Sequence, residues 1–403
     1  MSQFPPRPDR RLFLSTAALA FGEAAWGNSS SDAASPDANG GAYRGNQHRP
    51  TRDLLDWHSR LPPEPAREPE LPIVDAHHHL FGTAADRLYY RREDLQQDLA
   101  SGHRVLGTVY VAAYGAGWRT SGPPALRSVG EVERIVQLSA APLSTPHGTC
   151  QLAAGIVSDV DLSLGDGVGE LLEAHVAAGS ERLRGVRYYA TYHDGSLAKF
   201  IPNAPRNIMA DSSFRRGFAM LERFGLSFDA LVYHTQLSEL AALADAFPHT
   251  PIVLNHAGIP VGVLDFEPKQ TAVRKDWVKD LRALAQRPNV RIKVGGMGMP
   301  IFGFGFEAGE KPAETQALVR AWQPLMEICI EAFGPQRCML ESNFPVDKQS
   351  CSYVQLWNAF KLATGAFSPQ ERQALFYRTT CRTYGLPELE STCDAAVTRQ
   401  HRS

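Results

Sequence analysis

The sequence contains no CxxC pair, and this absence excludes a zinc ribbon or a thioredoxin-type redox centre. Scattered single cysteines are typical of buried structural thiols, and any disulfide between them depends on the compartment in which the protein resides. The six cysteines are Cys150, Cys329, Cys338, Cys351, Cys381 and Cys393.

The chain also lacks a long apolar run and an excess of basic residues. No run reaches the roughly 18 residues of a membrane-spanning helix. The 41 Lys and Arg residues face 43 Asp and Glu residues, which leaves a formal charge of −2. We therefore expect no membrane span and no nucleic-acid partner, because nucleic-acid binding needs a basic surface. A small molecule is the expected partner, and no feature of the sequence predicts an oligomeric state.

The N-terminal 70 residues differ in composition from the rest of the chain. Arg10 and Arg11 precede a short apolar run, which is the outline of a twin-arginine signal peptide over residues 1–27. Residues 28–70 are rich in Ser, Gly, Asp, Pro and Glu, and this composition predicts a disordered linker. We expect export to the periplasm. The alternative is a disordered basic start on a cytoplasmic protein, because Asp9, Ser15 and Glu23 fit a signal imperfectly.

From residue 71 onward, short apolar runs alternate with segments of helical periodicity. This alternation predicts a parallel sheet, because parallel strands need crossover helices. Eight repeats favour a single-domain (β/α)8 TIM barrel over residues 71–390, followed by a flexible tail over 391–403. An open doubly wound sheet is the alternative, but no GxGxxG or P-loop follows a strand. The expected strands are 73–81, 105–113, 151–157, 183–189, 226–234, 252–256, 290–294 and 338–344.

The working residues of such a barrel lie at the carboxyl ends of its strands. The first run ends in three histidines, and the two-residue period of a strand turns His77 and His79 to one side and His78 to the other. Two inward imidazoles can share one metal ion, so His77 and His79 are candidate ligands and His78 is a packing residue. His256 ends the sixth run and completes the candidate metal site.

Other strand ends supply a cation, a carboxylate or a further polar side chain. Each has an alternative role as a buried polar group or a surface charge, but their recurrence at successive strand ends favours a functional site. We interpret Glu341 as catalytic with the three histidines. The candidate substrate-binding residues are Arg187, Tyr233, His234, Lys293, Asn343 and Asp347.

The motifs "IVDAHHHLF", "RGVRYY", "IVLNHAGIP", "IKVGGMGM" and "ESNFP" resemble those of a known family in the same order. It is the amidohydrolase-related family of TIM-barrel hydrolases, which includes pyrone-dicarboxylate lactonase and sugar lactonases. The resemblance covers residues 71 to about 385. It implies a hydrolytic or decarboxylating site with an HxH pair. It also implies one divalent, zinc-like ion in some members and metal-independent catalysis in others.

The chain departs from this family at the eighth strand, where Asn343 stands in place of an aspartate. An asparagine can act neither as a carboxylate base nor as an anionic ligand. Glu341 is the expected replacement, because it lies two residues earlier on the same face of the strand. Asp347 is the other candidate, although it also suits the start of the following helix.

These residues predict that water attacks an activated ester carbonyl. A lactone is the first candidate substrate. The histidine cluster would hold the ion or polarise the carbonyl directly, the carboxylate would take the proton, and Arg187 or Lys293 would bind a carboxylate or the oxyanion. Two alternatives remain open. One is a metal-dependent decarboxylase on the same barrel, and the other is an exported, non-catalytic binding protein that has lost its base.

Overall fold

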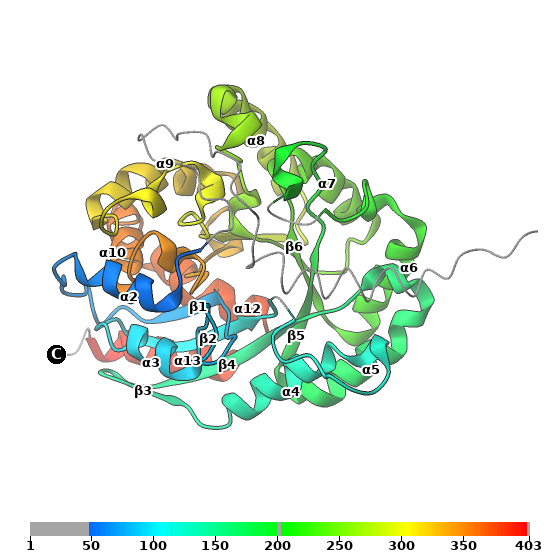
Figure 1. The fold of residues 1–403 in the computed structure, drawn as a ribbon, viewed down its shortest axis with the longest axis horizontal. Coiled ribbons are helices and arrows are strands. Elements are labelled where there is room, and N and C mark those ends of the chain that lie inside the picture. Colours follow the sequence, from blue (N-terminus) through cyan, green and yellow to red (C-terminus); the bar gives the residue numbers. More distant parts are fainter. Residues whose placement is uncertain (1–47, 114, 200–202, 401–403) are drawn as a thin grey trace, which may run out of the picture.

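The protein is a parallel β/α barrel in the computed structural model, which describes residues 48–113, 115–199 and 203–400 (Figure 1). Eight strands follow one another around the sheet in the order β1-β2-β4-β5-β6-β7-β8-β9, and β3 pairs with β4 in antiparallel fashion outside this path. The strands are β1 (Ile73–His78), β2 (Val105–Val111), β3 (Leu143–Thr145), β4 (Gly148–Asp159), β5 (Leu183–Tyr189), β6 (Ser227–Leu231), β7 (Ile252–Leu254), β8 (Val290–Val294) and β9 (Cys338–Leu340).

Helices surround the sheet on its outer side (Figure 1). The helices are α2 (Thr51–Ser59), α3 (Arg92–Leu99), α4 (Val129–Leu138), α5 (Val168–Gly179), α6 (Ser212–Phe224), α7 (Leu237–Ala246), α8 (Gln270–Ala285), α9 (Thr315–Phe333), α10 (Tyr353–Ala363), α11 (Pro369–Gln373), α12 (Thr379–Thr383) and α13 (Pro387–Gln400). The expected TIM barrel is therefore confirmed, with eight barrel strands at the predicted places.

Hydrogen bonds between the end of β1 and the chain just after β9 bring the two edges of the sheet together. Asn343 N donates to His77 O at 2.8 Å, and His79 N donates to Phe344 O at 2.8 Å. The buried carboxylate of Asp75 supports this closure by accepting hydrogen bonds from Ser342 N at 2.8 Å and from the Tyr353 hydroxyl at 3.0 Å. The end of β1 and the chain after β9 are thereby held side by side.

Local sequence explains where the crossover helices begin and end. Asp211 caps α6, because its side chain accepts hydrogen bonds from Ser213 N and Phe214 N. Gly225 ends the same helix with φ of 64°, a left-handed conformation that glycine adopts without steric cost. Phe214, Phe218 and Leu221 form its buried face. The chain therefore turns directly from α6 into β6.

The prediction of a disordered linker over residues 28–70 is wrong for residues 48–70, which the structure describes. Within them α2 places Leu54 and Trp57 on one face, and both side chains are buried. The Trp57 indole donates to Gly309 O at 2.9 Å. The Pro- and Glu-rich composition of this stretch suggested disorder. Two apolar residues three positions apart are nevertheless enough to pack a short helix on an existing surface. The expected signal over 1–27 lies outside the described residues.

The predicted flexible tail is also wrong where the structure describes it. Residues 391–400 belong to α13, on which Leu389, Cys393 and Ala396 are buried. Their spacing of four and three residues places them on one helix face. All six cysteines lie among the described residues, and each is buried and free. The compact unit therefore extends to the end of α13.

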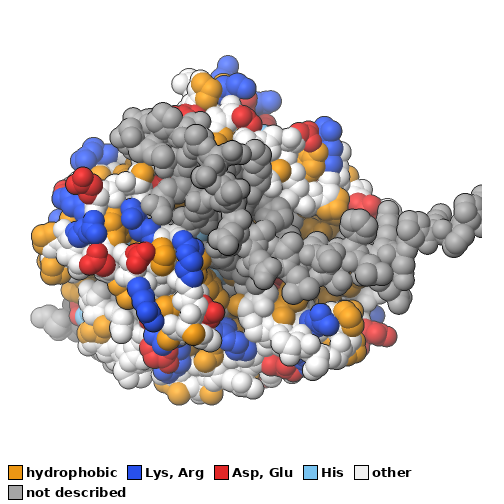
Figure 2. All heavy atoms as spheres, viewed as in Figure 1, with side chains coloured by type: hydrophobic (Ala, Val, Ile, Leu, Met, Phe, Trp, Pro, Cys, Tyr) orange, Lys and Arg blue, Asp and Glu red, His pale blue; other side chains and the backbone are white. Residues whose placement is uncertain are grey.

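Charges of both signs are interspersed over the face shown in Figure 2. This mixture is consistent with the near-zero net charge. Within the described residues, no helix is both long enough and apolar enough to cross a membrane.

Candidate active site at the carboxyl ends of the strands

His77 and His79 converge as the strand period predicts. Their Nε2 atoms lie 3.3 Å apart. His79 Nδ1 lies 2.8 Å from Val111 O, which fixes the orientation of its ring. His78 faces the other way and packs its ring edge against Tyr110, with centroids 5.9 Å apart. Burial is the largest of the causes that lower the pKa of both His77 and His79 well below the usual range of an imidazole.

Glu341 connects this pair to His256. Its Oε1 accepts a hydrogen bond from His256 Nδ1 at 2.8 Å, and its Oε2 lies 3.0 Å from His77 Nδ1. Candidate ligand atoms of His77, His256 and Glu341 all lie within 4.8 Å of one another. The structure thus brings together the four residues that we interpreted as catalytic.

Two strained backbone positions lie at this cluster. His256 and Asn343 both have φ of 53°, a left-handed conformation that non-glycine residues seldom adopt. The Asn343 side chain donates to Asp347 Oδ1 at 2.8 Å, and Gly298 N donates to Asp347 Oδ2 at 2.8 Å. Burial raises the pKa of Asp347 well above its usual range. Asn343 and Asp347 therefore form a hydrogen-bonded pair that is anchored to the loop after β8.

Glycines form the wall behind the cluster. A Cβ atom on Gly295 would lie 2.3 Å from Glu341 Cγ, and one on Gly296 would lie 2.5 Å from His256 Nδ1. On Gly298 it would lie 2.8 Å from Asp347 Cβ. Because real side chains cannot approach so closely, the segment after β8 needs glycine at these positions to let three site residues pack against it.

Arg187 lies beside His77. Its Nη1 is 3.4 Å from His77 Nε2, and its Nη2 donates to Ala112 O at 2.6 Å. Nη2 also bonds to the Tyr189 hydroxyl, and the guanidinium lies 4.6 Å from the centre of the Tyr189 ring. The side chain is thus held with one nitrogen directed at the histidines.

Lys293 lies in a different place from the one expected of a substrate-binding residue. It is fully buried, and its Nζ lies 2.7 Å from Asp229 Oδ2 and 3.3 Å from His77 Nδ1. Asp229 also accepts hydrogen bonds from the Tyr384 hydroxyl at 3.0 Å and from Asn255 Nδ2 at 3.0 Å. Asp229 is not among the site residues predicted from the sequence, although a single carboxylate inside the apolar run "SFDAL" is the available signal.

Tyr233 and His234 contact another part of the strand ends. His234 Nδ1 accepts a hydrogen bond from Val261 N at 3.3 Å, and its ring packs on Phe266 with centroids 5.2 Å apart. Burial lowers the pKa of His234 to about 4. Tyr233 is buried beside it. Among the described residues, no hydrogen bond joins either side chain to the histidine cluster.

The donor set of the cluster suits a divalent ion. Two nitrogens bound to tetrahedral zinc at 2.0–2.1 Å are separated by about 3.3 Å, which matches the spacing of the His77 and His79 Nε2 atoms. A carboxylate that bonds to the other ring nitrogen is a usual partner of a ligating histidine. Glu341 has this relation to His256.

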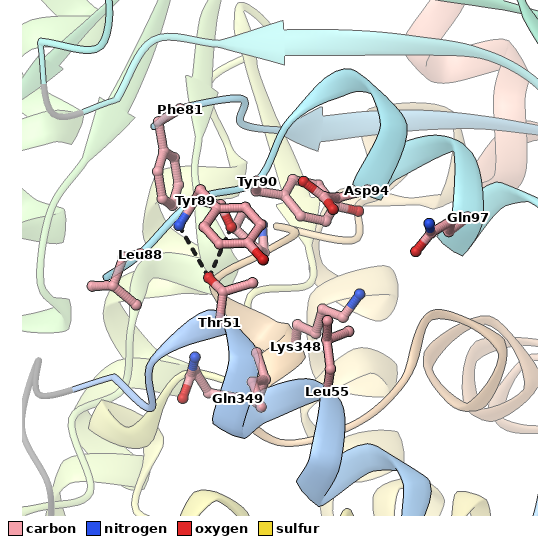
Figure 3. A pocket seen from close by; sticks show the side chains of 12 residues that line it. Thr51, Leu55, Phe81, Leu88, Tyr89, Tyr90, Asp94, Gln97, Lys348 and Gln349 are labelled. Atoms are coloured by element: carbon pink, nitrogen blue, oxygen red, sulfur yellow. Dashed lines mark hydrogen bonds between the residues drawn. The ribbon is translucent and has the colours of Figure 1, made fainter. Parts of the chain in front are cut away.

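A separate groove lies between α2 and the chain that connects β1 to α3 (Figure 3). Thr51 joins its two sides, because its hydroxyl donates to Tyr89 O at 2.9 Å and accepts from Tyr89 N at 3.0 Å. None of the four residues interpreted as catalytic lines this groove. The lining residues are Thr51, Leu54, Leu55, Phe81, Leu88, Tyr89, Tyr90, Asp94, Gln97, Pro345, Lys348 and Gln349.

Comparison with known proteins identifies a family and several relatives of the barrel. The family model described as Amidohydrolase matches residues 74–386. An uncharacterized protein of Sinorhizobium fredii, y4mH, is 39% identical over 232 residues, which are 57% of this chain and 69% of that protein. The L-fucono-1,5-lactonase of Burkholderia multivorans is 32% identical over 184 residues, and the match spans 45% of this chain and only 59% of the lactonase.

A solved structure supports the same fold. An amidohydrolase from Burkholderia multivorans, crystallised with bound zinc, superposes with a TM-score of 0.59 at 23% sequence identity. The superposition covers 78% of this chain and 99% of that protein.

Proposed function

The chain belongs to the amidohydrolase family, and from this premise we propose that it hydrolyses the ester bond of a lactone. The observation that carries the proposal is the meeting of three histidines, Glu341 and Arg187 at the carboxyl ends of the barrel strands. A lactonase among the relatives supports this class of substrate. A cyclic ester needs only an activated water and a group that stabilises the developing oxyanion.

We assign the activation of water to His256 together with Glu341. Glu341 Oε1 accepts the Nδ1 proton of His256 at 2.8 Å, which leaves the lone pair of the ring on Nε2. That nitrogen can take a proton from water while the carboxylate stabilises the resulting imidazolium, as in a Ser-His-Asp triad. Glu341 is thus the expected carboxylate, but it acts through His256 rather than on water directly.

Arg187 would stabilise the negative charge that develops on the carbonyl oxygen. Its Nη2 is held by Ala112 O, and its Nη1 is directed at His77 Nε2 at 3.4 Å. A guanidinium that is already oriented loses little entropy when the transition state forms, and it is most effective away from bulk water. Arg187 is buried.

A divalent ion fits the same site, with His77, His79 and His256 as the residues that would hold it. When bound, such an ion lowers the pKa of a coordinated water to about 7 and polarises a carbonyl group. His79 is oriented for this role by Val111 O, and His256 by Glu341. An ion held by Nε2 of His256 would occupy the nitrogen that otherwise takes the proton from water, so His256 serves either as the base or as a ligand, and Arg187 is the proposed oxyanion partner in both cases.

The test is a substrate panel on the full-length protein. The panel contains five- and six-membered sugar lactones, an aryl ester and aromatic carboxylic acids, each assayed after chelation and again with added Zn²⁺. We expect acid release from lactones and its loss in His256→Asn. His249→Asn is the matched control, because His249 is exposed and precedes β7. Release of CO₂ without lactone hydrolysis would instead identify a decarboxylase, and binding without turnover would identify a binding protein.

A further inference from the structure

Two carboxylates flank Arg187 in the same layer of the barrel. Asp159 at the end of β4 and Asp229 on β6 are both register partners of Arg187 on β5. Neighbouring strands lie about 4.8 Å apart, and register partners in a parallel sheet direct their side chains to the same face. Arg187 points into the barrel, where its Nη1 lies 3.4 Å from His77 Nε2. Asp159 and Asp229 therefore also point into the barrel, one on each side of Arg187.

The two carboxylates differ in their surroundings. Asp229 is fully buried and accepts hydrogen bonds from Lys293 Nζ at 2.7 Å and from the Tyr384 hydroxyl at 3.0 Å. Asp159 is partly exposed, and among the described residues no hydrogen bond or ion pair reaches its carboxylate. The protein thus uses the carboxylate on β6 for its own packing and leaves the one at the end of β4 available to a bound molecule.

Arg187 and Asp159 offer complementary groups to a substrate. A guanidinium can only donate hydrogen bonds, and we have assigned that of Arg187 to the carbonyl oxygen of the lactone. Burial raises the pKa of Asp159 from 3.8 to about 6, and the positive charge of Arg187 acts in the opposite direction. The Asp159 side chain is therefore mainly ionised at neutral pH and can only accept. A hydrogen-bond acceptor thus lies directly beside the donor for the carbonyl oxygen.

We propose that Asp159 is a specificity-determining residue that accepts a hydrogen bond from a hydroxyl group on the carbon next to the lactone carbonyl. Of the hydroxyl groups on a lactone ring, this one lies closest to the carbonyl oxygen. A substrate held by Arg187 therefore brings it nearest to the neighbouring strand β4. The inference names α-hydroxy lactones as the substrate class of the proposed lactonase site, and so it rests on the proposed function.

The first measurement compares three lactones as substrates of the full-length protein in the presence of Zn²⁺. α-Hydroxy-γ-butyrolactone, β-hydroxy-γ-butyrolactone and γ-butyrolactone differ only in the presence and the place of one hydroxyl group. We expect kcat/KM to be roughly 10- to 100-fold higher for the α-hydroxy lactone, which is the usual effect of a hydrogen bond to a charged group. An equal kcat/KM for γ-butyrolactone, or a preference for the β-hydroxy lactone, would overturn the proposal.

Substitutions of Asp159 separate contact with the substrate from an indirect effect through Arg187. In Asp159→Ala the preference for the α-hydroxy lactone over γ-butyrolactone should be lost. Asp159→Asn should retain part of it, because an amide oxygen still accepts a hydrogen bond. A loss of kcat/KM that is equal for both lactones would show that Asp159 acts only through Arg187, and would refute the assignment.

Ser158→Ala is the matched control for these variants. Ser158 is the preceding residue on β4, its side chain is buried, and its register partner is Val186 on the opposite face of the sheet from Arg187. The preference for the α-hydroxy lactone should equal that of the wild type. Circular dichroism verifies the fold of each variant. A preference that is lost in Ser158→Ala as well would attribute the effect to a distorted strand and contradict the proposal.

A binding measurement keeps the test independent of catalysis. The lactams 3-hydroxy-2-pyrrolidinone and 2-pyrrolidinone share the ring size and the carbonyl group of the lactones but have a less reactive bond. NMR titration of the full-length protein should show tighter binding of the hydroxylated lactam to the wild type, and no such difference in Asp159→Ala. If no lactone is hydrolysed, this result supports the role of Asp159 while the proposed function fails. Absence of the difference would refute that role even where lactones are hydrolysed, and the proposed function would stand.

Discussion

His77, His78 and His79 show how one strand gives adjacent identical residues different roles. His77 and His79 share a hydrogen-bonding network with Val111 and Lys293, whereas both ring nitrogens of His78 lack a partner among the described residues. His78 packs on Tyr110. The chemistry of the site therefore depends on the orientation of each imidazole and not on the number of histidines in the motif.

We expect the double substitution His77→Asn, His79→Asn to lower kcat by at least about 100-fold, because it removes two of the three imidazoles that we propose would hold the divalent ion. Lactone turnover is the readout, and circular dichroism verifies the fold. His78→Leu is the matched control from the same strand. It should keep both activity and stability, because an apolar side chain replaces a buried imidazole that has no hydrogen-bond partner. Equal losses in the two proteins would contradict this assignment.

The buried side chain of Glu131 makes the stability of the protein depend on pH. Its buried carboxylate accepts hydrogen bonds from the Tyr110 hydroxyl at 2.6 Å, Ala113 N at 2.9 Å and the Trp118 indole at 3.2 Å. Burial nevertheless raises its pKa from 4.5 to about 7. In this range the folded state binds the proton more tightly than the unfolded state, so Glu131 favours folding at low pH and loses this contribution as pH rises from about 4.5 to 7.

The measurement is urea unfolding of the wild type and Glu131→Gln at pH 5 and pH 8. Between these values, the free energy of unfolding of the wild type should fall relative to that of the variant by roughly 2–3 kcal/mol. A lower overall stability of the variant would not affect the comparison, since only the difference between the two pH values is used. A constant gap between the two proteins would show that Glu131 is ionised throughout.

At the scale of elements, α2 joins the two loops that follow β8 and β9. The Trp57 indole and the Arg49 guanidinium bond to Gly309 O in the loop after β8. His58 Nε2 lies 2.8 Å from Lys348 O in the loop after β9, which also carries Asp347. A helix that precedes the first strand thus holds chain segments from the opposite end of the barrel sequence.

We expect Trp57→Ala to destabilise the protein by about 3–5 kcal/mol, as large truncations of buried aromatics do. The reason is the loss of both its packing and its hydrogen bond to Gly309. Urea unfolding measures the change. Leu55→Ala on the same helix is the control, because 45% of that side chain is exposed, and its effect should be small. A small effect at Trp57 as well would mean that α2 contributes little to the barrel.

The elements also show which structural information the local sequence carries. Each barrel strand was predictable, because parallel strands buried on both faces read as continuous apolar runs. The carboxyl ends of the parallel strands meet at one end of the barrel, and this rule predicted the cluster of His77, His79, His256 and Glu341. The contact between Lys293 and Asp229 did not follow, because it depends on side-chain directions across two strands. The packing of α2 was missed because its partners lie about 250–300 positions further along the chain.

At the scale of the whole molecule, we propose export through the twin-arginine route. Arg10 and Arg11 precede a short apolar run of the kind that this route accepts, and they lie outside the described residues. Fractionation of a natural host tests the proposal with the wild type and the double variant Arg10→Lys, Arg11→Lys. The wild type should be periplasmic and shortened, and the variant should stay in the cytoplasm at full length. Full-length cytoplasmic protein in both cases would refute export.

All six free cysteines are buried, so their exposure to oxidants depends on when the chain folds. In the folded barrel no thiol is exposed, and burial raises the pKa of each one, so reactive thiolate is scarce. An unfolded chain would present the same six thiols to any oxidant, and non-native cross-links between them would block closure of the barrel. Under the proposed export, folding before the chain meets an oxidising compartment would therefore protect it against oxidative misfolding.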